Sequence, residues 1–168
     1  MLTLFDINKD LCDAWVAQFH DCLEVKILHT SLEDLPSHQY LVTAGNSYAI
    51  MDGGIDRAVR DMLGVEVQDA VQWCSVITYG GFIPIGAHIA VNTNNEKFPC
   101  LIYVPTMSVP MKIDSTNIYY AMTGFLGSYL RTQESIACCG LRTLTGQIPV
   151  ADAARIMKKA YKTVCEAI

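Results

Sequence analysis

Residues 40–56 read YLVTAGNSYAIMDGGID and join three patterns in one short stretch. Tyr40–Ala44 is a nearly continuous apolar run, which is typical of a strand buried on both faces of a sheet. A segment rich in glycine follows from Gly45 to Gly54, and a helical pattern begins at Ile55. The stretch therefore predicts a strand, a loop and a helix in that order, as in α/β folds.

The same alternation extends in both directions along the chain. A helix around Leu11, Trp15 and Phe19 follows the first apolar run and can be capped by Asp6 or Asn8. Further apolar or alternating runs predict strands at residues 2–5, 25–28, 87–91, 100–104 and 135–139, with Pro105-Thr106 ending the fourth. Helical patterns cover residues 55–63, 65–74, 115–131 and 149–167. We therefore expect an α/β sheet covered by helices on both faces, in one domain.

The composition fits a single globular domain. The chain has 168 residues, of which 51% are hydrophobic and 17% charged. No apolar stretch reaches the roughly 18 residues that cross a membrane, so no membrane association is expected. The net charge of −5 argues against a binder of duplex nucleic acid, which normally carries a basic surface. The apolar residues must be buried in the core or between subunits, so both a monomer and a homo-oligomer agree with the composition.

The cysteines indicate a reducing compartment. Seven are present without a C-x-x-C motif, and the four histidines are scattered, so neither a metal site nor a cofactor is expected. The opening MLTLFDINKD lacks the basic and apolar regions of a signal peptide. We expect a cytoplasmic protein in which cysteines serve mostly as small core residues.

A second loop rich in glycine, CGLRTLTGQ at residues 139–147, follows another apolar run. Ligands of open α/β sheets bind beyond the carboxyl ends of the strands. Backbone amides without a neighbouring Cβ, just before a helix, suit an anion such as a diphosphate. Either loop alone is equally typical of a plain strand-to-helix turn. Two of them after strands of one sheet favour a ligand site.

Standard nucleotide and hydrolase motifs are absent from the sequence. Neither GxxxxGK[ST] nor GxGxxG after a strand occurs. Residues 45–49, GNSYA, come near the GxSxG elbow of serine hydrolases but end in alanine. These signatures therefore do not account for the two loops.

Asn46, the GGID at 53–56 and the GLRTLTGQIPVADAARIMKKAY at 140–161 resemble a macro domain, the module that binds ADP-ribose. The similarity spans roughly residues 24 to 165 and is greatest to a bacterial and phage-type branch with a DGGID element and a turn like Val104–Met107. It implies a three-layer α/β/α sandwich with a mixed, mostly parallel central sheet, formed by residues 1–168 as a single domain.

The resemblance also implies roles for individual residues. Asn46 would bind the distal ribose hydroxyls, and the amides of residues 53–55 would wrap the diphosphate. Asn46 and Asp56 have the spacing of the catalytic pair in MacroD-type ADP-ribosyl hydrolases. In that role, the dipole and free amides of the first helical turn would keep Asp56 ionised, which suits the positioning of water. Alternatively, Asp56 is only an acidic residue in a first helical turn that stabilises the helix dipole. The implied ligand-binding residues are Ala44, Gly45, Asn46, Asp52, Gly53, Gly54, Ile55, Gly140, Leu141, Arg142, Thr143, Leu144, Thr145 and Gly146.

The chain departs from the family pattern at several places. In the family, a carboxylate usually accepts from the adenine amino group. That carboxylate is missing from Thr30–Leu32, and Glu33 or Asp34 would take its place. Asp52 places a negative charge where a third glycine often stands. Arg142 occupies a position that is often small, where it would either meet phosphate or face solvent.

Three functions follow from these observations. The first is recognition of ADP-ribose or an ADP-ribosylated substrate, to which hydrolysis of ADP-ribosyl linkages could be added. The second is a sensor or sequestering module that binds ADP-ribose nucleotides without turnover. The third is an interaction module that keeps the fold and lacks a working pocket.

Overall fold

A mixed sheet forms the centre of the computed structural model, which describes residues 1–141 and 147–167. Its six strands follow the order β2-β1-β6-β3-β5-β4, and only β4 runs antiparallel to its neighbour. The strands are β1 (Leu2–Asp6), β2 (Val25–His29), β3 (Tyr40–Asn46), β4 (Ile89–Asn92), β5 (Cys100–Met107) and β6 (Ile136–Cys139).

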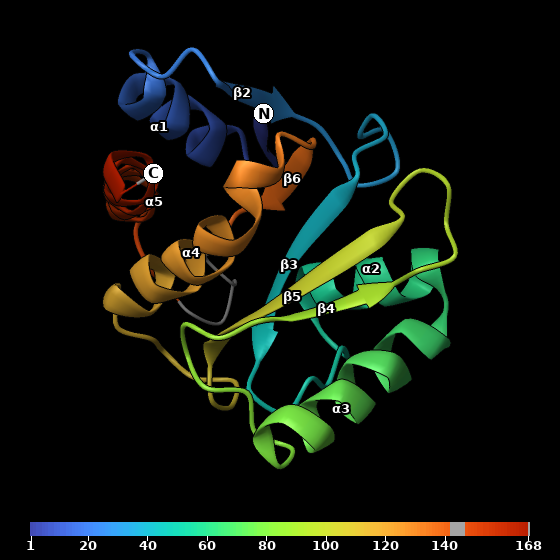
Figure 1. Cartoon of the computed structure of the whole chain (residues 1–168). Helices are drawn as coiled ribbons and strands as arrows, with labels where there is room; N and C mark the ends of the chain where they lie inside the picture. Colours follow the sequence, from blue (N-terminus) through green and yellow to red (C-terminus); the bar gives the residue numbers. More distant parts are fainter. Residues whose placement is uncertain (142–146, 168) are drawn as a thin grey trace.

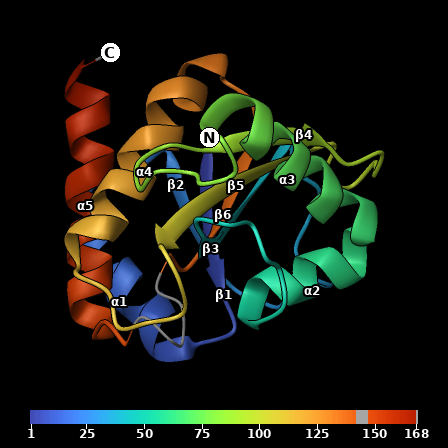
Figure 2. The ribbon, with the colours of Figure 1, turned by 90° about the horizontal axis from the view of Figure 1, so that it is seen from below.

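Helices cover both faces of this sheet (Figures 1 and 2). One face carries α1 (Lys9–Phe19), α4 (Thr116–Tyr129), which continues into the 3₁₀ turn η1 (Leu130–Thr132), and α5 (Val150–Ala167). The other face carries α2 (Gly54–Leu63) and α3 (Val65–Tyr79). Because helices lie on both sides, the inner strands are almost wholly buried: β3 is buried from Leu41 to Asn46 and β6 along its whole length. The outer strands β2 and β4 are only partly buried. The expected three-layer α/β/α sandwich is confirmed.

Local interactions set the ends of the helices. Asn8 caps α1, since its Oδ1 accepts a hydrogen bond from the amide of Leu11 at 3.2 Å. Asp6 instead accepts from the amide of Asn8 at 2.8 Å. Gly64, with φ of +98°, separates α2 from α3, and Gly80 ends α3 in the left-handed conformation. The described residues contain no helix with the length and apolarity needed to span a membrane.

The prediction that Pro105-Thr106 ends a strand was wrong. Strand β5 continues to Met107, and the pairing with β3 shifts there, from Gly45 opposite Pro105 to Asn46 opposite Met107. Thr106 is thus the extra residue of a bulge, a place where a sheet tolerates proline without an N–H group. The bulge lets both strands run on to the residues of the candidate site.

Candidate functional site

Five parallel strands end at the same edge of the sheet, which we call the carboxyl edge. Their last residues are His29 of β2, Asp6 of β1, Cys139 of β6, Asn46 of β3 and Met107 of β5. Strand β6 pairs with both β1 and β3, so the two loops rich in glycine leave neighbouring strands. Gly140 and Leu141 are buried at the start of the second loop. The other predicted residues of that loop, Arg142, Thr143, Leu144, Thr145 and Gly146, lie outside the described residues.

Asn46 shapes the first loop with its own side chain. Its Oδ1 accepts hydrogen bonds from the amides of Tyr48 (3.0 Å) and Ile50 (3.3 Å), and its Nδ2 donates to the carbonyl of Ile50 (2.9 Å). Asn46 is 8% exposed. An amide nitrogen has two donor hydrogens, so one stays available to a ligand after the loop has been closed.

Helix α3 holds the same loop from outside. The amide of Met51 donates to Gln68 Oε1 at 2.7 Å, and Gln72 Nε2 donates to the carbonyl of Ala49 at 3.1 Å. Ala49 has a φ of +54°, which is uncommon for a residue with a side chain, and these bonds support that conformation. The loop is therefore fixed before any ligand arrives.

The N-terminus of α2 has amides available to an anion. Gly53 occupies the cap position without a capping side chain, and Gly54 follows with a φ of +56°. Both glycines are exposed, and a Cβ on either would meet no atom within 4 Å. Free amides in a first helical turn attract anions through their N–H groups and the helix dipole. Asp52 is exposed directly before them, and Ile55 is half-buried.

Asp56 is sealed beneath this loop. It is 4% exposed, and one carboxyl oxygen accepts a hydrogen bond from Thr43 Oγ1 at 2.8 Å. Burial raises the pKa of Asp56 to about 8, with a further increase from the charge of Asp52, and the Thr43 bond only partly opposes this. The expectation that the helix dipole keeps Asp56 ionised was wrong, because burial outweighs the dipole. Burial therefore favours the neutral acid over the carboxylate.

Tyr103 completes a buried polar cluster with Thr43, Gly45 and Asp56. Its hydroxyl donates to the backbone carbonyl of Asn46 at 2.8 Å, and burial raises its pKa. A Cβ added to Gly45 would overlap both the Tyr103 hydroxyl and Asp56 Oδ2, so these two groups meet under the Cα of Gly45. Ala44, the preceding predicted residue, is buried in β3. Through the bond from the Tyr103 hydroxyl, the cluster fixes the backbone of Asn46.

Asp6 is a candidate site residue that the sequence did not predict. Its sequence position predicts only a helix cap, although Asp6 directly follows the apolar run of β1, as Asn46 follows that of β3. A Cβ on Gly140 would lie 2.6 Å from Asp6 Oδ2, so this carboxylate reaches the second loop. The backbone carbonyl of Asp6 accepts from the amide of Thr30 at 3.1 Å. Asp6 therefore stands beside the segment from which the expected carboxylate is missing.

A hollow of about 280 Å³ lies away from this edge, between α4 and α5. It is lined mainly by apolar surface, including Tyr119, Tyr120 and Val164, with Arg131 at its border. None of the predicted ligand-binding residues that the structure describes lines it. The free amides, the Asn46 side chain and the Asp6 carboxylate all lie at the carboxyl edge, which makes that edge the better candidate for a polar, anionic ligand.

Comparisons with known proteins agree with this geometry. A family model described as Macro domain matches residues 42–157. The macrodomain of Mycobacterium tuberculosis DarG is similar in structure, with a TM-score of 0.67, 18% identity and coverage of 80% of this chain and 87% of that one. The macrodomain of Thermus aquaticus DarG has a TM-score of 0.67, 13% identity and coverage of 96% and 91%.

A macrodomain of Oceanobacillus iheyensis, solved with ADP, has a TM-score of 0.57, 16% identity and coverage of 78% of this chain and 86% of that one. A sequence search of curated proteins finds no match. At these identities the solved structures establish the fold. The family rests on the matched residues 42–157, which include Asn46, the α2 N-terminus and the start of the second loop.

Proposed function

The chain belongs to the macro domain family, and from this we propose that it binds ADP-ribose or an ADP-ribosyl group at the carboxyl edge. The proposal rests on the N-terminus of α2, which begins at Gly53 and Gly54 without a capping side chain. The side-chain amide of Asn46 lies at the same edge of the sheet, at the end of β3. The diphosphate is the ligand group that suits these amides. The solved neighbour with ADP supports a ligand of this class.

Each part of the ligand has a partner of suitable chemistry in this proposal. The remaining Nδ2 hydrogen of Asn46 donates to a hydroxyl of the distal ribose. The amides of residues 53–55 and the second loop enclose the diphosphate. Asp6, rather than Glu33 or Asp34, accepts from the adenine amino group, since Asp6 reaches Gly140 whereas Asp34 is exposed and accepts from Ser31 Oγ at 3.1 Å.

A melting experiment tests this proposal. ADP-ribose at 100 times its dissociation constant should stabilise the protein by about 2.7 kcal/mol. ADP and NAD serve as comparison ligands, and ribose 5-phosphate as a control that lacks the diphosphate. An unchanged melting temperature with ADP-ribose at millimolar concentration would leave the third alternative, a fold without a working pocket.

Hydrolysis of ADP-ribosyl linkages is the second candidate, favoured by the pair Asn46 and Asp56 at the loop and the helix that follows it. Because Asp56 is covered by Gly45 and Tyr103, it would contribute to turnover by placing Asn46 rather than by contacting water. Release of ADP-ribose from a mono-ADP-ribosylated protein or nucleic acid separates a hydrolase from a sensor. All seven cysteines are free, in keeping with action in the reducing cytoplasm.

A further inference from the structure

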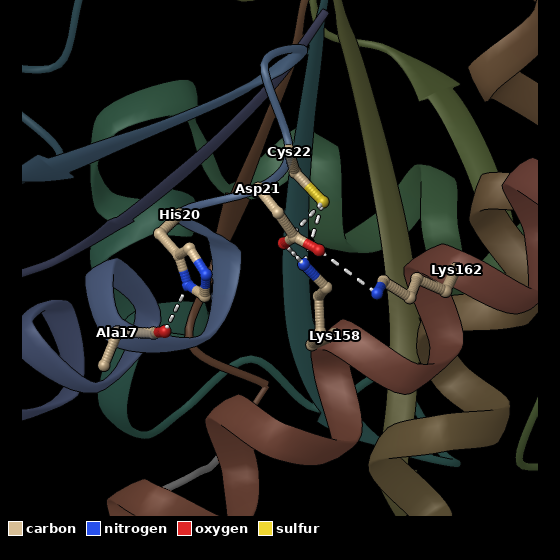
Figure 3. A network of polar contacts seen from close by, with 6 residues as sticks. All are labelled: Ala17, His20, Asp21, Cys22, Lys158 and Lys162. Carbon is tan, nitrogen blue, oxygen red and sulfur yellow. Dashed lines mark hydrogen bonds and ion pairs between the residues drawn. The ribbon is translucent and has the colours of Figure 1, made fainter.

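A buried lysine joins the turn after α1 to helix α5, and it contacts a cysteine. Lys158 of α5 is 7% exposed. Its Nζ donates to the carboxylate of Asp21 and to Cys22 Sγ, which is 3.0 Å away (Figure 3). The Phe19 ring lies 5.2 Å from the same nitrogen. Among the described residues, Cys22 is the cysteine that a lysine ammonium contacts.

Both atoms of the contact are held in place by their surroundings. The amide of Cys22 donates to the carbonyl of Phe19 at 2.9 Å, and the carbonyl of Cys22 accepts from the amide of Val25 at 3.1 Å. Lys162, one turn further along α5, pairs with Asp21 Oδ2 at 3.2 Å (Figure 3). The nitrogen and the sulfur therefore stay within reach without rearrangement. Cys22 is only half-buried, so a small oxidant can reach it.

We propose that Cys22 and Lys158 form a reversible S–O–N bridge when the protein meets a peroxide. Hydrogen peroxide first oxidises the thiol to a sulfenic acid, and water leaves. The ammonium of Lys158 then gives one proton to solvent. A second peroxide removes two electrons from the sulfenic oxygen and the amine, the O–N bond forms, and two further waters leave. Two equivalents of a dithiol reductant supply the four electrons that return the thiol and the amine, and the bridging oxygen leaves as water.

The charge of the cluster predicts how this reaction depends on pH. Burial by itself would lower the pKa of Lys158, but its hydrogen bonds to Asp21 and Cys22 raise it overall. The amine must be neutral to form the O–N bond, so the yield at fixed peroxide should rise as the pH is raised from 7 to 9. The bridge would tie the turn before β2 to α5 across 136 residues of sequence.

Peptide mapping of the peroxide-treated whole chain tests the proposal. We expect a cross-linked peptide pair containing Cys22 and Lys158, heavier than the sum of its parts by one oxygen less two hydrogens, which disappears with dithiothreitol. Cys22→Ser and Lys158→Arg should abolish it, and the arginine variant keeps a cation for Asp21. Cys165→Ser, which removes an exposed cysteine of α5, should leave it unchanged.

The melting temperature gives a second readout on the same samples. A cross-link over so long a loop restricts the unfolded chain, so oxidised wild-type protein should melt roughly 5–10 °C above the reduced protein, and Cys22→Ser should show no rise. The proposal is overturned if Cys22 proceeds to sulfinic acid without a cross-link. A bridge to Lys162, or one lacking the added oxygen, overturns it as well.

Discussion

Gly53 and Gly54 are adjacent, but they adopt different backbone conformations. Gly53 has a φ of −145°, which any residue can adopt, whereas Gly54 has a φ of +56°. A Cβ has free space at both positions, so only the backbone conformation separates them energetically. Substitutions at the two positions therefore separate effects on ligand binding from effects on the stability of the fold.

Alanine at each of these positions gives the first prediction. Gly54→Ala should lower the free energy of unfolding by about 1 kcal/mol, because the left-handed conformation costs an L-residue about that much. Gly53→Ala should stay within about 0.5 kcal/mol of wild type. Urea denaturation measures both. Equal losses of unfolding free energy in the two variants would show that the positive φ of Gly54 does not favour glycine at that position.

Asp56 makes a second prediction, on the pH dependence of stability. Its pKa is about 8 in the folded protein, above the ordinary value of 3.8. Between these values the unfolded chain has released the proton and the folded protein keeps it, so this group makes stability fall as the pH rises from 4 to 8. Asp56→Asn should remove that contribution.

Relative to wild type, the Asp56→Asn variant should therefore gain a few kcal/mol in its free energy of unfolding between pH 4 and pH 8. Urea denaturation at both pH values gives the difference. The matched control is Asp34→Asn, an exposed carboxyl that should change little. A difference between Asp56→Asn and wild type that is constant across this range would show that Asp56 is ionised in the folded protein.

At the scale of elements, Tyr103 of β5 links that strand to the end of β3. Its hydroxyl donates to the Asn46 carbonyl, which also accepts from the amide of Ala49 at 3.1 Å, so Tyr103→Phe removes one of two donors to that carbonyl. We expect a loss of about 0.5–1.5 kcal/mol in stability, the net value of one hydrogen bond, and several-fold weaker binding of ADP-ribose. The control is Tyr120→Phe, since Tyr120 is 54% exposed. Unchanged affinity in a folded Tyr103→Phe variant would show that Asn46 needs no support from β5.

The unit β1-α1-β2 lies outside the matched residues 42–157, and its strand β1 pairs with β6. We predict that Asp6→Asn, which preserves an acceptor for the amide of Asn8, weakens ADP-ribose binding roughly tenfold through loss of a charged acceptor. The variant should also lose the preference for ADP-ribose over its hypoxanthine analogue. Calorimetry with both ligands checks this, and an intact preference would assign adenine recognition elsewhere.

These elements also show how far sequence reasoning reaches. Apolar runs and helical spacing predicted the strands and helices, because the buried face of each element repeats apolar residues with the period of that element. The order of the strands depends on contacts between residues that are distant in sequence. The sequence therefore did not predict that β1 lies beside β6, on which the proposed role of Asp6 depends. The bulge at Thr106 and the burial of Asp56 depend likewise on neighbours in β3 and β5.

At the scale of the whole molecule, the sheet brings together groups that are far apart in sequence. Asp6 and Asn46 end two strands, Gly140 follows a third, and the N-terminus of α2 follows the loop after β3; parallel pairing places these strand ends at one edge. Helices on both faces leave that edge as the place where backbone amides stay free. The central claim is that this edge binds ADP-ribose through the N-terminus of α2.

Isothermal titration calorimetry of ADP-ribose into wild type and Gly53→Val tests this claim most directly. Wild type should bind with a dissociation constant that is roughly micromolar, about −8 kcal/mol. Gly53→Val should melt near the wild-type temperature, because the position is exposed and unstrained, yet show no binding heat, because the side chain blocks the diphosphate. Wild-type protein without heat at any concentration, or a variant that binds as wild type does, would contradict the account.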